Sequence, residues 1–172
     1  FWDSGSGTGS MYFWNHDHPD EKLRELYRNP KFKQAMSHAI DRPRIKTVVY
    51  YETGMLTTGT MSPKAIEFNF NAEAQALFQE ARDAYVDYDP DKAAFHLREA
   101  GLDSLEVSLS AADAAFGGAV DAGLLYSEAA RPGGIDITVV REPNDGYWSS
   151  VWMQKPFCAV YWGGRPTADQ ML

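Results

Sequence analysis

The chain has 172 residues, about the length of one domain, and 44% of them are hydrophobic, which is enough to form a core. Its 16 basic and 24 acidic side chains give a formal charge of -8, which opposes nonspecific binding to nucleic acid or to an anionic lipid surface. No stretch approaches the ~20 apolar residues that a membrane-spanning helix requires, and the single cysteine, Cys158, excludes a disulfide within the chain.

The first part of the chain is predicted to be mostly helical. A segment rich in Gly, Ser and Thr precedes a short aromatic strand at 11–15. Apolar spacing, proline and capping residues predict helices at 20–28, 30–41, 43–51, 72–85 and 90–100. Residues 53–63 interrupt this pattern. For the last helix we expect Asp89 as the N-cap, Pro90 as the first helical residue and Gly101 as the C-terminal stop.

The second part alternates between strands and helices. Strands are expected at 105–109, 135–140 and 157–162, with helices between them at 114–130 and 147–153. Strands that are separated by helices imply right-handed crossovers. The sequence therefore predicts an α/β fold with a largely parallel sheet flanked by helices.

Two separate motifs carry a family resemblance. Residues 33–43 read Lys-Gln-Ala-Met-Ser-His-Ala-Ile-Asp-Arg-Pro, and residues 88–102 read Tyr-Asp-Pro-Asp-Lys-Ala-Ala-Phe-His-Leu-Arg-Glu-Ala-Gly-Leu. In this order they resemble the solute-binding proteins of peptide and nickel ABC importers, a family that includes dipeptide- and oligopeptide-binding proteins. The similarity continues through the strand at 135–140 to the Trp-Gly-Gly segment that begins at residue 162.

The resemblance implies one lobe of a type II periplasmic-binding-protein-like fold. Residues 1–172 would form a single domain, and because no targeting segment precedes them we expect an excised second lobe of a two-lobed protein. The implied function is that of the substrate-binding component of an ABC importer. It would be a periplasmic protein that is not an enzyme, needs no cofactor and captures a peptide-like or other small solute, including an anionic one, in an interlobe cleft. The implied partners are this solute, the permease subunits in the membrane and the first lobe of the same chain, with no nucleic acid.

The segment after the last predicted strand is the first candidate for a ligand site, because ligands of parallel sheets bind beyond the carboxyl ends of the strands. Trp162 offers an aromatic surface, Gly163 and Gly164 allow close approach of a ligand to the backbone, and Arg165 can hold a carboxylate through two hydrogen bonds. In the alternative interpretation, Trp162 ends a core strand and Arg165 pairs with a surface acid.

Arg165 also departs from the family pattern. In dipeptide- and oligopeptide-binding relatives an aspartate follows the Trp-x-Gly motif and receives the α-amino group of the ligand, whereas Arg165 stands at that position here. A guanidinium repels an ammonium group, so we expect an anionic or N-terminally blocked ligand. A shifted register would instead make Asp169 the acceptor. Near the other end of the chain, the resemblance also makes Trp14 and Asn15 candidate ligand contacts.

The competing function is that of a metal-dependent enzyme or metal-binding protein that uses His16 and His18 as zinc or nickel ligands. These two side chains point the same way on an extended segment, but no helical histidine pair completes the set. We therefore assign no metal ligand and expect a loop in which Asp17 or Asp20 caps the next helix.

Four other conspicuous side chains are assigned to structure. Cys158 lies in an apolar strand with no adjacent base and is expected to be inert. His38 is expected at a helix surface or boundary. Trp148 and Trp152 are spaced to form one aromatic face that packs on the sheet rather than in a cleft.

Overall fold

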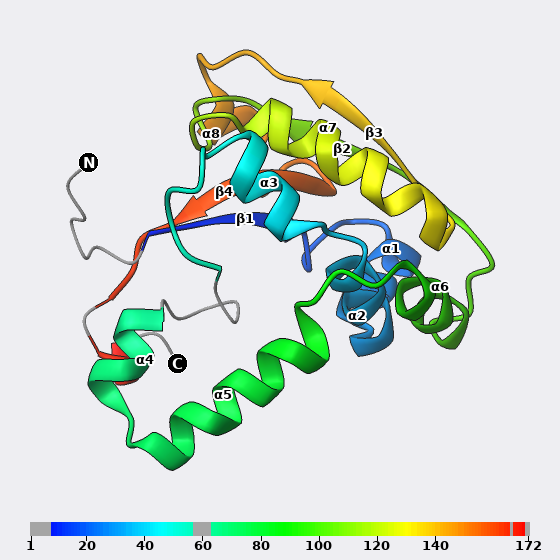
Figure 1. The fold of residues 1–172 in the computed structure, drawn as a ribbon. Coiled ribbons are helices and arrows are strands. Elements are labelled where there is room, and N and C mark those ends of the chain that lie inside the picture. The colour runs from blue at the N-terminus through cyan, green and yellow to red at the C-terminus, as the bar shows by residue number, and fades with distance from the viewer. Residues whose placement is uncertain (1–7, 57–62, 166, 171–172) are drawn as a thin grey trace.

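The structure is a computed structural model that describes residues 8–56, 63–165 and 167–170. Its centre is a four-stranded sheet with helices around it (Figure 1). The strands are β1 (Gly9–Trp14), β2 (Leu105–Ala111), β3 (Ile135–Arg141) and β4 (Phe157–Trp162), in the spatial order β1-β4-β2-β3. β2 runs parallel to β3 and β4, which confirms the α/β class and the largely parallel sheet. β1 pairs with β4 in the antiparallel direction.

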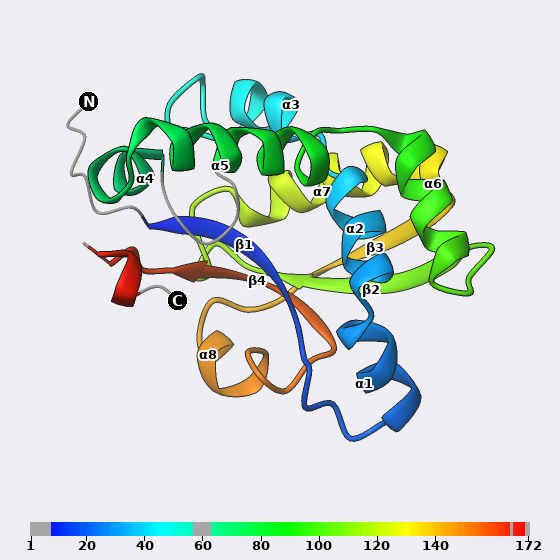
Figure 2. The same ribbon diagram turned by 90° about the horizontal axis from the view of Figure 1, so that it is seen from below.

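Helices on both faces connect the parallel strands. α7 (Ala119–Ala130) and the 3-10 turn η1 (Arg131–Gly133) join β2 to β3, and α8 (Tyr147–Ser150) joins β3 to β4. Figure 2 shows α7 on one side of the sheet and α8 on the other. α7 lies close to the sheet at Gly123, where an added Cβ would meet the Leu109 side chain at 3.3 Å. Packing against the sheet thus favours a small residue at this position.

The first part of the chain is helical, as predicted. Its elements are α1 (Glu21–Arg28), α2 (Pro30–His38), α3 (Arg42–Val48), α4 (Pro63–Asn69), α5 (Ala72–Tyr85) and α6 (Pro90–Glu99). The Asp20 carboxylate accepts hydrogen bonds from the first turn of α1, and Asp89 caps α6 in the same way. Gly101 ends α6 with a φ of +86°. None of the helices in the described ranges is long and apolar enough to cross a membrane.

The core lies between the sheet and helices α1, α2, α6 and α7. Trp14, Phe32 and Phe157 pack together there, with Phe32 and Phe157 fully buried. Tyr126 of α7 is also buried, and its hydroxyl donates a hydrogen bond of 2.8 Å to the carbonyl of Met36 in α2. A second buried cluster, which includes Tyr147, Val151 and Cys158, is distinct from this core.

The first family motif binds the segment that leads into the second. Three of its side chains donate hydrogen bonds to three successive backbone carbonyls that begin at the last residue of α5: Ser37 to Tyr85, Arg42 to Val86 and His38 to Asp87. His38 is completely buried, so the expectation of a helix-surface or boundary position is wrong. The His38 Nδ1 donates to the Asp87 carbonyl at a distance of 2.9 Å. The backbone carbonyl of His38 accepts a hydrogen bond from the N–H of Asp89, also at 2.9 Å.

Candidate functional site

The carboxyl ends of β2, β3 and β4 meet at one edge of the sheet, where the antiparallel β1 begins (Figure 2). Three loops leave this edge, after Ala111, Arg141 and Trp162. In a parallel sheet this is the edge at which ligands bind. It holds four of the residues that the sequence proposed, at positions 162–165.

Trp162 and Arg165 are both accessible to a ligand. Trp162 is the last residue of β4 and is 45% exposed. The Arg165 guanidinium lies 3.3 and 3.4 Å from the carbonyl oxygens of Gly163 and Gly164 in its own loop. A Cβ on Gly163 would lie 3.4 Å from this guanidinium, an ordinary van der Waals distance, so the position of the arginine does not itself require glycine there. Within the described part of the chain no carboxylate pairs with Arg165, and the interpretation of a surface ion pair gains no support.

Asp169 follows on the short turn η2 (Ala168–Gln170). It is exposed, and no ion pair joins it to Arg165. η2 packs against α4, so the segment after Arg165 lies beside that helix. Asp169 therefore remains a second candidate, on the same stretch of chain as Arg165.

Trp14 and Asn15 lie elsewhere, at the opposite end of β4. Trp14 pairs with Phe157 in the sheet register, and their rings stack at 3.8 Å. Because each strand residue advances by about 3.3 Å, Trp14 is ~17 Å from Trp162 along the sheet. The Asn15 side chain is buried, donates to the Met153 carbonyl at 3.1 Å and accepts from the N–H of Asp17. The structure thus gives these two residues packing and turn contacts and does not bring them together with Trp162.

The same edge holds polar side chains that sequence reasoning missed. Ser110 of β2 donates a hydrogen bond of 2.8 Å to the Glu142 carboxylate after β3. Asn144 accepts from the N–H of Ala114 at 2.9 Å, which ties the two loops together. Their position directly after predicted parallel strands was the signal that could have found them. These contacts join the loops after β2 and β3, and Ser110 is level with Cys158 in the sheet register, four residues before Trp162.

An aromatic pair also lies next to Trp162. Trp148 of α8 meets Tyr161 of β4 edge to face, with ring centroids 5.1 Å apart. Both remain accessible, at 39% and 49% exposed. Trp152 is half-buried, packs against Phe13 of β1 and meets Trp148 edge to face with ring centroids 5.9 Å apart, so both tryptophans contact the sheet, with Trp148 the more exposed.

The histidines of the competing hypothesis do not form a metal cluster. Nδ1 of His18 accepts a hydrogen bond of 3.2 Å from the N–H of Asp20, and the ring of His16 stacks on Phe13. Partial burial, followed by repulsion from nearby cations, lowers the pKa of His16. Over the ranges that the structure describes, no three His, Cys, Asp or Glu side chains are placed to hold one ion. Cys158 is buried, and burial raises the pKa of its thiol to about 11.

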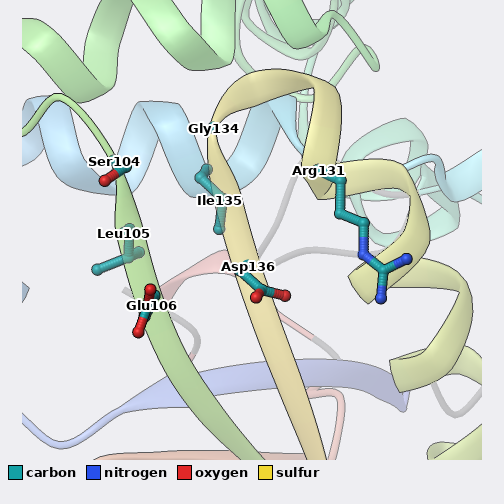
Figure 3. Close-up of a pocket in the computed structure, with 7 residues that line it drawn as sticks. All are labelled: Ser104, Leu105, Glu106, Arg131, Gly134, Ile135 and Asp136. Atoms are coloured by element: carbon teal, nitrogen blue, oxygen red, sulfur yellow. The ribbon is translucent and has the colours of Figure 1, made fainter.

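A hollow of about 320 Å³ lies at the other edge of the sheet (Figure 3). It is lined by the first residues of β2 and β3 and by their flanks: Ser104, Leu105, Glu106, Arg131, Gly134, Ile135 and Asp136. This is the amino end of the parallel strands, away from the loops after Trp162. The hollow is therefore separate from the candidate site.

The chain matches the family model described as bacterial extracellular solute-binding proteins, family 5 Middle, over residues 2–172. No curated protein matches it.

Solved structures share the fold. A dipeptide-binding protein from Pseudoalteromonas sp. SM9913, in complex with Met-Leu, is 20% identical with a TM-score of 0.73 over 97% of this chain and 31% of that one. The ABC transporter-associated periplasmic binding protein DppA from Helicobacter pylori, in complex with the peptide STSA, is 16% identical with a TM-score of 0.71 over 97% of this chain and 29% of that one. NikZ from Campylobacter jejuni, in complex with Ni(L-His), is 20% identical with a TM-score of 0.66 over 95% and 31% of the two chains. This chain thus spans about three tenths of their length.

Proposed function

The chain belongs to the bacterial extracellular solute-binding proteins of family 5, and from this premise we propose that it is one lobe of a periplasmic receptor that captures a small solute and delivers it to an ABC permease. The solute would lie at the edge of the sheet where β2, β3 and β4 end, between this lobe and the first lobe of the same chain. The receptor would be a binding protein and not an enzyme.

The observation that carries this proposal is the exposed pair of Trp162 and Arg165. Trp162 provides an aromatic surface and Arg165 a guanidinium whose only described hydrogen bonds are weak ones to its own loop. An arginine without a carboxylate partner is well suited to bind one from a ligand, through two parallel hydrogen bonds. Both residues lie where ligands of parallel sheets bind.

The same arginine defines the class of solute. A free ammonium group next to Arg165 would be repelled, whereas a carboxylate or a blocked amine would not. We therefore propose an anionic or N-terminally blocked solute, of peptide-like or other small structure. Binding would draw the two lobes together, because the closed state has contacts from both walls of the cleft and hence the higher affinity.

The test is a thermal-shift screen of the full-length gene product. The panel pairs free peptides with their N-acetylated forms and adds opines, sugar conjugates and metal chelates. We expect the largest rise in Tm from compounds that carry a carboxylate and no free amine. Strongest stabilisation by ordinary free-amine peptides would reject the proposed solute class, and the absence of any hit would count against a receptor for such solutes.

A further inference from the structure

α4 and α5 form an arm, residues 63–85, that projects away from the sheet (Figure 1). Phe70 and Phe78 pack with ring centroids 4.9 Å apart and join the two parts of the arm. The main contacts of the arm with the rest of the described chain are those of α5 with α2 and of α4 with η2. The arm is thus held together by its own packing and has few contacts with the rest of the described chain.

One side of α5 is apolar and open to solvent. The side chains that share it, at helical spacing, are Ala74, Leu77, Ala81, Ala84 and Tyr85, which we call the α5 stripe. Leu77 is 62% exposed and Tyr85 is 50% exposed. On α4, Phe68 is 83% exposed. An amphipathic helix normally turns such a stripe toward a packed neighbour.

Leu124 on α7 shows what an ordinary exposed leucine looks like in this protein. It is 54% exposed but stands between Asp121 and Glu128 on the outer face of its helix, and Glu128 pairs with Arg44 at 3.0 Å. Single apolar side chains on a polar face are common and need no partner. The α5 stripe differs because its apolar residues are contiguous.

We propose that the α5 stripe packs against the part of the same polypeptide that lies outside these 172 residues, namely the first lobe. This inference rests on the proposed function. Solved proteins with this fold have about three times the length of this chain, so they contain enough further structure to supply such a surface. The contact between α4 and η2 places the arm beside the segment that follows Arg165, on the side where a second lobe would meet the candidate site.

The attachment of the arm supports this assignment. Ser37, His38 and Arg42 bind backbone carbonyls at the end of α5 and directly after it, and so fix where the helix joins the body. Those three contacts use carbonyl groups and leave the stripe uncovered. The arm is therefore fixed at its base with its apolar side free to receive a partner.

The experiment compares Leu77→Ala with Leu124→Ala in the full-length gene product. If the first lobe covers Leu77, truncation removes buried contacts and lowers Tm by about 2 to 4 °C in a protein of roughly three times this length, whereas Leu124→Ala changes it by less than about 1 °C. Leu77→Glu should lower Tm further than Leu77→Ala. Sedimentation should show a monomer for the wild type and all variants.

Three outcomes would overturn the inference. Equal Tm values for Leu77→Ala and Leu124→Ala would show that the Leu77 side chain remains exposed to solvent in the full-length protein. A dimer that Leu77→Glu dissociates would assign the stripe to a second copy of the chain. A stripe whose backbone amides exchange hydrogen as fast as an exposed loop would also reject it. Solute binding is measured on the same samples, so a protein that binds no solute yet depends on Leu77 for stability would reject the proposed function and retain the arm contact.

Discussion

The guanidinium of Arg42 donates a hydrogen bond of 2.7 Å to the backbone carbonyl of Val86, 44 residues away in the sequence. The same group donates to the Ser37 carbonyl at 2.9 Å, at the end of α2. One side chain thus satisfies a backbone acceptor in the first motif and another in the segment that leads into the second. Arg42 therefore holds the end of the first motif against the chain that enters the second.

Replacement of Arg42 should destabilise the folded protein. Arg42→Gln removes the contacts to Val86 and Ser37 and leaves partly buried carbonyls without a donor, so we expect the free energy of unfolding to fall by about 3 kcal/mol. Arg44→Gln is the matched control, because its ion pair with Glu128 is exposed and should contribute less than about 1 kcal/mol. Urea denaturation of both variants measures the difference, and equal losses would contradict the role given to Arg42.

Alanine substitutions of the two tryptophans at opposite ends of the β1–β4 pair should have opposite effects, one on stability and the other on solute binding. Trp14→Ala removes a ring that stacks on Phe157 in the core and should cost about 3 to 5 kcal/mol of stability. Trp162→Ala should cost less than about 1 kcal/mol because that ring is 45% exposed, yet it should weaken solute binding. Denaturation and calorimetric titration check the two halves. Weakened binding in a folded Trp14→Ala variant, with normal binding in Trp162→Ala, would reverse the assignment.

Asp89 should stabilise α6 in a pH-dependent way. Its carboxylate accepts a hydrogen bond of 3.0 Å from the N–H of Lys92, and this backbone contact is the main reason why its pKa is lowered. Since the folded pKa lies below the unfolded one, the stabilisation is complete above about pH 4 and fades as the pH falls through the lower, folded value.

Two substitutions at this position separate the cap from the charge. Asp89→Ala should cost about 1 kcal/mol at pH 7, and its deficit should shrink in acid. Asp89→Asn should keep most of the cap, because an asparagine side chain accepts the same hydrogen bond. Unfolding curves at pH 7 and pH 3 provide the test. A deficit of Asp89→Ala that is equal at both values would argue against a carboxylate cap.

Local signals were strong enough to predict most elements of the fold. α5 and β4 have the predicted bounds, and Asp20, Asp89 and Gly101 act at helix ends as their residue types suggest. α4 was missed. Its apolar residues Ile66 and Phe68 are two apart, which is a strand-like spacing.

Long-range pairing could not be predicted in the same way. No local sequence pattern indicates that β1 pairs antiparallel with a strand more than a hundred residues later in the chain. Only the register of this pairing brings the ring of Trp14 onto that of Phe157. For the same reason, Trp14 and Asn15 could be proposed for the site together with Trp162. The segment at 162–165 was proposed because it follows a strand, which is a local signal with a known spatial meaning.

Arg165 is proposed to face the solute and to select against a free amine. The most direct test of this proposal is a calorimetric titration of the full-length protein with the best solute from the thermal-shift screen, in the wild type, in Arg165→Asp and in Arg98→Asp. Arg98 is an exposed arginine on α6 and controls for the change of charge. We predict that Arg165→Asp binds at least about 30-fold more weakly, equivalent to ~2 kcal/mol, while Arg98→Asp binds like the wild type. Unchanged affinity in Arg165→Asp would show that Arg165 does not contact the solute.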